Sequence, residues 1–182
     1  MLNKLSLVFA LLAAPAFSAG IEIDVTGEAK GLIKIDLFED IAPNHVDRIT
    51  TLARDGAYDG VVFHRVIDGF MAQTGDVQYG KVEGDVANAG YGSSSMDDLK
   101  AEFSSIKFEE AIVGMARGQT VDSANSQFFI MLAPYPPLNG QYTVVGKVTE
   151  GFDVVKKIKL GLGRNGAVLG EMDWMVSVTV TD

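Results

Sequence analysis

Alternation of apolar and polar residues predicts that much of this chain is β-structure. Residues 21–25 (Ile-Glu-Ile-Asp-Val) alternate strictly and residues 31–37 alternate less cleanly, so these segments predict a strand and its returning partner. Apolar runs also predict a hairpin at residues 61–74 and strands at residues 111–115, 127–132, 142–148 and 175–181.

Two of these segments carry more detailed predictions. Asn139-Gly140 is a turn signal directly before the strand at 142–148. In the closing strand, Val176, Val178 and Val180 follow one another at a spacing of two. They are therefore predicted to share one face of the sheet.

Helical spacing occurs in two places. Pro43 stands where a helix can begin, because the first helical position does not use its N–H. Apolar residues then recur at helical spacing before Gly56, namely Val46, Ile49, Leu52 and Ala53. We predict a helix over residues 43–55 with one apolar face. A second short helix after Gly151 is predicted from Phe152, Val155, Ile158 and Lys159.

The order of elements predicts the fold class. A Gly- and Ser-rich passage at residues 80–95 has few large apolar residues and is predicted to be a surface loop, functional or mobile because of its length. The strands come in short antiparallel runs and do not alternate regularly with helices. About eight strands and two helices in this order favour an all-β barrel or sandwich with added helices.

The first nineteen residues have the layout of a secretory signal peptide. A positive start at Lys4 precedes an apolar run at residues 5–14, and small residues follow at 14–19. The run is too short to span a bilayer, which needs about 20 apolar residues. We expect cleavage near residues 16–19, and a single mature domain over residues 20–182.

Charge and cysteine content exclude several functions. Without residues 1–19 the chain keeps 14 basic and 24 acidic side chains, a formal charge of −10. This argues against binding to nucleic acid and to anionic lipid. The chain has no cysteine, so disulfides, thiol nucleophiles and cysteine zinc sites are excluded.

Three familiar site types fit poorly. The segment 161–166 matches G-x-G-x-x-G, but a predicted helix precedes it and a strand follows it, the reverse of a nucleotide-binding turn; we predict a flexible loop. His45 and His64 are the two histidines and no metal-ligand spacing links them. We expect His45 to be exposed and His64 to be a hydrogen-bonded core residue. Ser123 and Ser126 lie near Asp122 without a nucleophile elbow, so they are expected to bond to backbone.

Two stretches instead combine large apolar side chains with Arg or Gln, namely residues 61–76 (VVFHRVIDGFMAQTGD) and 114–132 (GMARGQTVDSANSQFFIML). Apolar walls with a few convergent polar groups are typical of a ligand pocket. Residues 63–76 also resemble the signature of the cyclophilins, the peptidyl-prolyl isomerases. Residues 126–130 resemble that family's second block, and residues 138–148 its third, in family order. The similarity covers roughly residues 21–182.

The resemblance implies a fold, an activity and a set of site residues. The fold would be a closed eight-stranded antiparallel barrel capped by two helices. Arg65 would be the catalytic arginine, with no metal or other cofactor. Gln73 and Gln127 would bind the substrate backbone, and Ala116 would border the groove for residues before proline. The proline pocket would be walled by Phe70, Met71, Phe129 and Leu138, with Tyr142 beside it.

The chain departs from the family pattern at three positions. Pro137 stands where the family often has Trp, Tyr142 where it often has His, and Arg117 where Asn is common. Since that Trp contributes to cyclosporin binding in the family, we expect cyclosporin to bind weakly. Arg65 and the pocket wall are retained, so catalysis is expected to survive.

The isomerase hypothesis makes a geometric demand on the hairpin. A two-residue Asp68-Gly69 loop would place Arg65 opposite Ala72 and Gln73 on the other face. A one-residue bulge would place Arg65 opposite Met71 with Gln73 on its own face, because a slip of one residue exchanges faces. We therefore predict a bulge or a longer turn.

The sequence thus predicts an exported, monomeric prolyl isomerase acting on folding, proline-containing polypeptides, in the periplasm of a bacterium. We expect no nucleic-acid binding and no membrane insertion after processing. A peptide-binding chaperone on the same barrel with little turnover is the alternative. A metallohydrolase using His45 and His64 is a second one.

Overall fold

The computed structural model describes residues 19–181. The predicted signal segment therefore lies outside the described residues, except for Ala19. In the described part no helix is both long and apolar enough to cross a membrane.

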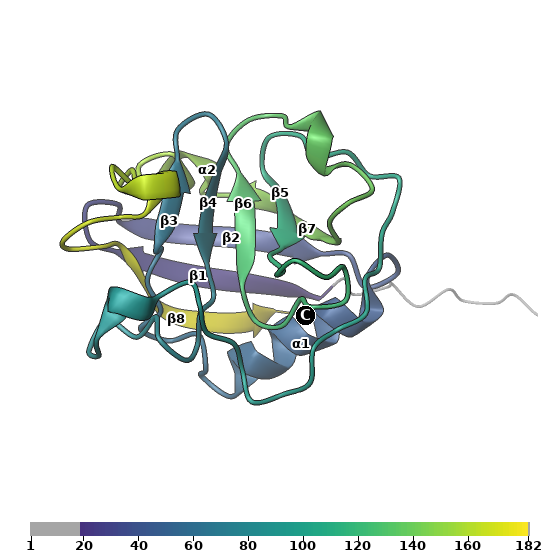
Figure 1. Cartoon of the computed structure of the whole chain (residues 1–182), viewed down its shortest axis with the longest axis horizontal. Coiled ribbons are helices and arrows are strands. Elements are labelled where there is room, and N and C mark those ends of the chain that lie inside the picture. The colour runs from purple at the N-terminus through teal and green to yellow at the C-terminus, as the bar shows by residue number, and fades with distance from the viewer. Residues whose placement is uncertain (1–18, 182) are drawn as a thin grey trace, which may run out of the picture.

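Within residues 19–181 the chain forms eight strands, two α-helices and three short 3₁₀ turns (Figure 1). The strands are β1 (Gly20–Thr26), β2 (Gly31–Leu37), β3 (Arg65–Ile67), β4 (Met71–Thr74), β5 (Ile112–Met115), β6 (Phe128–Met131), β7 (Val144–Glu150) and β8 (Trp174–Thr181). The helices are α1 (Pro43–Arg54) and α2 (Phe152–Val155), and the 3₁₀ turns are η1 (Val86–Asn88), η2 (Pro136–Leu138) and η3 (Arg164–Gly166).

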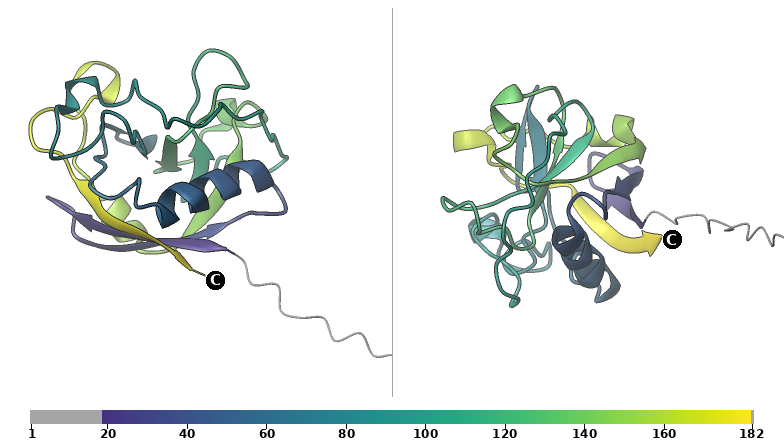
Figure 2. Two further views of the ribbon diagram at one scale, coloured as in Figure 1. Left: turned by 90° about the horizontal axis from the view of Figure 1, so that it is seen from below. Right: turned by 90° about the vertical axis from the view of Figure 1, so that its right-hand side faces the viewer.

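All eight strands belong to one antiparallel sheet in the order β3-β4-β6-β5-β7-β2-β1-β8. The sheet is strongly curled, since β3, β4 and β6 stand upright in Figure 1 while β1, β2 and β8 run across it. The two ends of the sheet meet at a single bridge between Val62, just before β3, and Trp174. The mainly-β prediction is confirmed, and Figure 2 shows α1 lying against the curled sheet.

The sheet separates two apolar clusters. In β6, Phe128 and Ile130 belong to the main core, whereas Phe129 and Met131 belong to a second cluster on the opposite face. This follows from the two-residue period of a strand. Because β6 has an apolar neighbour on both faces, its sequence is continuously apolar and does not alternate.

The β3–β4 hairpin meets the geometric demand. Three residues, 68–70, connect the strands, and Arg65 pairs with Gln73. The longer turn, one of the two predicted possibilities, is confirmed. The other, a one-residue bulge pairing Arg65 with Met71, does not form; the longer loop moves the pairing in the opposite direction. Gly69 has φ 65°, in the left-handed region that favours glycine.

The predicted face of the last strand is wrong at one residue. Val178 is 4% exposed, whereas Val176 is 45% exposed. Asp24 pairs with Ser177 and Val25 pairs with Met175, so Val176 is an extra residue in a bulge. A bulge interrupts the alternation and turns Val176 outward.

The helices differ in how well they match prediction. Helix α1 begins at Pro43 as predicted and buries its apolar face. Helix α2 stops after Val155, earlier than predicted, and continues only as turns, with Ile158 N–H bonding to the Val155 carbonyl. The buried Asp173 carboxylate then accepts the backbone N–H of Lys159 at 2.7 Å, which takes that N–H away from any further helix.

His45, predicted to be exposed, is fully buried. Its Nδ1 lies 2.6 Å from Glu102 Oε2. The Glu102 carboxylate also accepts the backbone N–H groups of Asn44 and His45, so a distant segment covers the start of α1. Burial acts to raise the pKa of Glu102, but the hydrogen bonds from His45 and Asn44 outweigh it and hold that pKa below its ordinary value.

Candidate functional site

Three residues of the candidate site lie in one row across the sheet. Arg65 of β3 pairs with Gln73 of β4, and Gln73 pairs with Phe129 of β6. Paired residues in a sheet point to the same face, so all three side chains lie on the face of the second apolar cluster. Gly114 of β5 continues the row, and a Cβ there would lie 2.6 Å from the rings of both Phe108 and Phe129. This glycine leaves room for the two stacked rings.

The row borders a cavity of about 180 Å³. It is lined by the predicted residues Arg65, Phe70, Met71, Gln73, Ala116, Phe129, Leu138 and Tyr142, together with Arg117. Of the predicted site residues, only Gln127 is outside it. A cavity of about 150 Å³ can hold a benzene ring, so the size suits a five-membered ring. The Tyr142 ring stands edge-on to Phe129, with centroids 5.9 Å apart.

The Arg65 guanidinium is held from two sides. Its Nε donates to the Asn165 carbonyl at 2.9 Å, and its Nη1 donates to Gln73 Oε1 at 3.1 Å. Nη2 has no hydrogen-bond partner among residues 19–181 and is left as a free donor. Partial burial lowers the pKa of Arg65, but an arginine stays protonated in proteins. The site therefore presents a fixed positive charge beside the apolar side chains of the cavity wall.

Hydrogen bonds running in one direction orient the two glutamines. Gln73 Nε2 donates to Gln127 Oε1 at 2.9 Å, and Gln127 Nε2 donates to the carbonyls of Gly92 and Gly90 at 2.8 and 3.1 Å. The direction is dictated by its ends, because Arg65 can only donate and carbonyls can only accept. Each amide is thus fixed in one of its two possible orientations.

The last acceptors of this hydrogen-bond chain, the carbonyls of Gly90 and Gly92, are held in place by Asp76. Its buried carboxylate accepts four backbone N–H groups, from Gln78, Tyr79, Gly90 and Gly92. A Cβ at Gly92 would lie 2.3 Å from Asp76 Oδ1, so only glycine permits this approach. Asp76 therefore anchors the 80–95 loop, which supplies the acceptors for Gln127.

A groove of about 380 Å³ adjoins the small cavity and shares Gln73, Ala116 and Arg117 with it. Gln127 and the backbone of Gly90 to Ser93 also line this groove. Arg117 stands between the two spaces, with its Cζ 4.5 Å from the centroid of the Tyr142 ring. The two spaces together could receive an extended peptide with a ring-bearing residue at one end.

His64 lies behind the site. It is 6% exposed, as predicted for a core residue, but neither ring nitrogen has a hydrogen-bond partner among residues 19–181, so the predicted hydrogen bond is wrong. Burial, with a further contribution from the charge of Arg65, lowers its pKa to about 4. No three His, Asp or Glu side chains within the described range are grouped as metal ligands.

The family model of cyclophilin type peptidyl-prolyl cis-trans isomerase/CLD matches residues 21–180. This chain belongs to the cyclophilin-type isomerase family. The predicted resemblance to cyclophilins is confirmed.

Relatives of this cyclophilin extend the match. A probable peptidyl-prolyl cis-trans isomerase of Brucella suis is 51% identical over 152 residues, covering 82% of this chain and 78% of that protein. A peptidyl-prolyl cis-trans isomerase of Helicobacter pylori is 38% identical over 134 residues, 72% of this chain and 77% of that protein. A cyclophilin of Cryptosporidium parvum, solved in the presence of the dipeptide Ala-Pro, matches with a TM-score of 0.76, 24% identity, and coverage of 90% and 99%.

Sequence reasoning missed two contributors to the site of this cyclophilin. Asn165 belongs to the G-x-G-x-x-G loop, which was predicted only to be a flexible loop. The loop packs on β3, where Gly161 N–H bonds to the Val66 carbonyl, and presents the Asn165 carbonyl to Arg65. Its glycines were a signal of close backbone packing, since a Cβ at Gly161 would overlap the Gly166 carbonyl. The role of Asp76 carried no signal beyond its place in the motif.

Proposed function

We propose that this protein is a peptidyl-prolyl cis-trans isomerase that accelerates rotation of X–Pro bonds in folding, exported polypeptides. The observation that carries the proposal is the Arg65 guanidinium, held by the Asn165 carbonyl and Gln73 Oε1 and with a free Nη2. It lies at a cavity of about 180 Å³ that Phe70, Met71, Phe129 and Leu138 wall. The Ala-Pro dipeptide named for the Cryptosporidium parvum structure supports a proline ring as the occupant.

The reaction needs no acid, base or metal, because no covalent bond breaks. Unaided X–Pro rotation takes about 10–100 s, and millisecond turnover needs roughly 10⁴-fold acceleration, about 5.5 kcal/mol. The barrier is amide resonance. As the bond twists, the prolyl nitrogen gains a lone pair and becomes an acceptor, which the Arg65 guanidinium binds better than the planar amide. Preferential binding of the twisted state lowers the barrier.

The other residues hold the substrate in place. Phe70, Met71, Phe129 and Leu138 enclose the ring, so that the acyl side of the bond rotates, and the apolar wall strengthens the arginine's interaction by excluding water. Gln73 and Gln127 bind the peptide backbone.

Residues before proline lie in the groove beyond Ala116 and Tyr142. Arg117 there sets the preference for those residues.

Substitution of Arg65 tests the mechanism. Arg65→Ala should lower kcat/KM on an Ala-Pro tetrapeptide roughly 10²- to 10³-fold, the usual loss when a donor to the transition state is removed. Peptide affinity should change only a few-fold. Arg65→Lys keeps the charge but loses the rigid fork of donors, so its activity should be intermediate. A protease-coupled assay measures turnover, and NMR titration measures binding.

Two outcomes would count against this mechanism. If the Arg65→Ala variant turned the peptide over as fast as the wild type, Arg65 would have no catalytic role. If the wild type bound the peptide without accelerating rotation, the alternative of a peptide-binding chaperone would hold instead.

We also propose that the protein acts in a bacterial periplasm as a monomer, and that the curled sheet closes into a barrel. The Val62–Trp174 bridge between its two ends supports closure. The layout of residues 1–19 supports export. Expression in a bacterium should yield a mature N-terminus between residues 17 and 20, found by N-terminal sequencing of the periplasmic fraction. An intact N-terminus in the cytoplasmic fraction would contradict export.

A further inference from the structure

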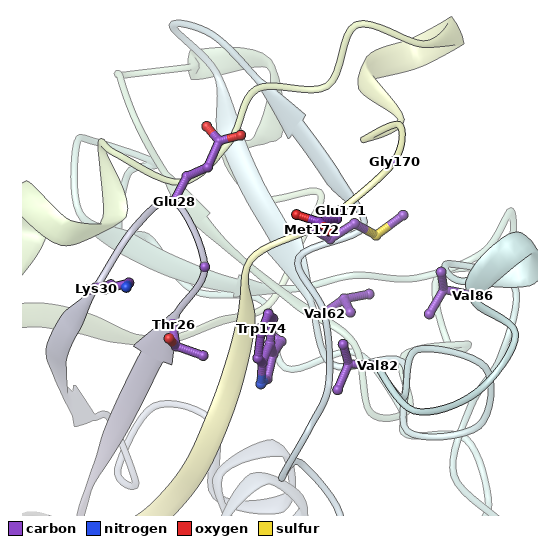
Figure 3. Close-up of a pocket in the computed structure, with 11 residues that line it drawn as sticks. Thr26, Glu28, Lys30, Val62, Val82, Val86, Gly170, Glu171, Met172 and Trp174 are labelled. Carbon is purple, nitrogen blue, oxygen red and sulfur yellow. The ribbon is translucent and has the colours of Figure 1, made fainter.

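A second cavity, of about 850 Å³, lies outside the candidate active site (Figure 3). Trp174 stands at its centre, between Thr26 on one side and Val62 and Val82 on the other. Met172 and Val86 complete the apolar lining. None of these residues borders the cavity beside Arg65 or the adjoining groove.

The apolar lining is partly open to solvent. Val82 is 38% exposed and Trp174 is half-buried, whereas Val62 is buried; Leu169, next to the lining residue Gly170, is exposed. Trp174 Nε1 has no hydrogen-bond partner within residues 19–181 and is not sealed off from solvent. Contiguous exposed apolar surface on a soluble domain is typical of a binding site, and an indole that keeps a free N–H can also bind a backbone carbonyl.

The rim is polar and only partly neutralised. Glu28 pairs with Lys159 at 3.5 Å, and Lys159 Nζ also bonds to the Glu171 carbonyl at 2.7 Å. Lys30 is exposed and forms none of the ion pairs among the described residues. An apolar floor with a mixed charged rim suits a polypeptide segment, which carries apolar side chains and polar backbone together.

The same loop borders this cavity and the active-site groove. Val82 and Val86 line the cavity, and Gly90 to Ser93 line the groove. Gly90 follows Val86 by four positions, so the two edges are at most about 14 Å apart. An extended client that leaves the groove can therefore reach Trp174 within a few residues.

We propose that the Trp174 cavity is an exosite for the client polypeptide and binds bulky apolar side chains located about four to eight residues before the proline. This rests on the proposed isomerase function, which places the residues before proline in the groove. The exosite would retain unfolded chains, which expose such side chains, in preference to folded proteins.

Three peptides without tryptophan test the inference: an Ala-Pro tetrapeptide, and two matched 20-residue peptides with one Ala-Pro bond. One long peptide carries leucines four to eight residues before the proline and serines at the matching positions after it. The other carries the serines before the proline and the leucines after it. Trp174 is the single tryptophan of the chain, so its fluorescence reports on the cavity directly. The leucine-before peptide should have a KM about tenfold lower than its counterpart, and it alone should shift the emission to shorter wavelength.

The double variant Val82→Asp/Val86→Asp should abolish both effects while leaving tetrapeptide turnover unchanged. Ile41→Asp is the matched control, because Ile41 is 39% exposed and borders none of the cavities described above. It should behave as the wild type does.

The failures can be told apart. Equal KM values for the two long peptides, with the tetrapeptide turned over, would overturn the exosite and leave the isomerase standing. If no peptide is isomerised, the proposed function fails, and the fluorescence titration still decides whether the cavity binds the apolar segment. An emission shift that depends on protein concentration alone would assign the cavity to a second copy and overturn the inference.

Discussion

The position of Arg65 depends on a carbonyl contributed from a hundred residues further along the chain. Asn165 has φ 58°, a left-handed conformation that asparagine and glycine tolerate well and β-branched residues do not. This backbone conformation points the Asn165 carbonyl at Arg65, where it accepts the hydrogen bond from Nε. Asn165 is thus a positioning residue.

The Asn165→Val substitution should lower kcat on the Ala-Pro tetrapeptide roughly tenfold with little change in KM, because a small displacement of a catalytic group is costly. Asn165→Gly should retain near-normal kcat, since glycine adopts the same φ. Steady-state kinetics on both variants decide this. Equal losses in the two variants would mean that the asparagine side chain, rather than the backbone turn, is what matters.

His64 should make stability depend on pH. Its pKa is about 4 in the folded protein and about 6.5 in an unfolded chain. The unfolded state therefore takes up the proton first, and the free energy of unfolding falls as the pH drops from about 6.5 to about 4. The full loss is of the order of 3 kcal/mol, and this group adds no further loss below pH 4.

Urea unfolding at pH 7, 5.5 and 4 measures this effect. Carboxylates also titrate near pH 4, so the comparison is with His64→Leu, which should lack the component between pH 6.5 and 4. Identical pH profiles for the two proteins would show that His64 does not contribute.

Single residues were predictable from the sequence where a contiguous motif fixes their role. The motif around Arg65 named four residues that line the small cavity, and the resemblance to cyclophilins elsewhere in the chain named the other predicted ones. The burial of His45 was not predictable, because Glu102, which covers it, lies 57 residues away in an irregular segment. The Asn165 acceptor of Arg65 and both acceptors of Gln127 Nε2 are backbone carbonyls, and a carbonyl position cannot be inferred from the side chains in a sequence.

The β3–β4 turn places Arg65 and Gln73 on one face, so its three-residue loop is a functional element. Gly69 has φ 65°, and no atom lies within 4 Å of a Cβ added there. Gly69→Ala should therefore cost only the left-handed backbone strain, about 1–2 kcal/mol.

Gly69→Asn should cost less, because asparagine tolerates this region. Thermal unfolding of both variants measures the difference. Equal stabilities for alanine and asparagine would indicate that the turn changes its conformation in the variants.

Elements were predictable wherever local periodicity decides them, as in α1 and the β1–β2 pair. The bulge at Val176 was not, because it depends on how β8 pairs with β1 rather than on the sequence of β8. The early end of α2 likewise depends on Asp173, a side chain from beyond the helix. Such outcomes belong to tertiary contacts, which override local preference.

At the scale of the whole molecule, the curled sheet has strand neighbours that are far apart in sequence. β4 pairs with β6, and β2 pairs with β7. Periodicity predicts that strands exist but not which strands pair, so the arrangement of the sheet could be anticipated only from the resemblance to cyclophilins.

Helix α1 shows the same dependence on distant segments. Its N-cap residue Ala42 provides no side-chain cap, and Glu102 accepts the N–H groups that a local cap would have bound. A helix of twelve residues is marginal by itself in water.

Capping of α1 by the distant Glu102 should affect the order of folding. The first turn of α1 cannot be completed until residues 96–106 have docked, so this contact should form after the rate-limiting step. Glu102→Gln should then speed unfolding about fivefold, as expected for about 1 kcal/mol of lost capping, and leave the folding rate nearly unchanged. Stopped-flow measurements across a denaturant series would show this, whereas an equal slowing of folding would place the docked segment in the nucleus.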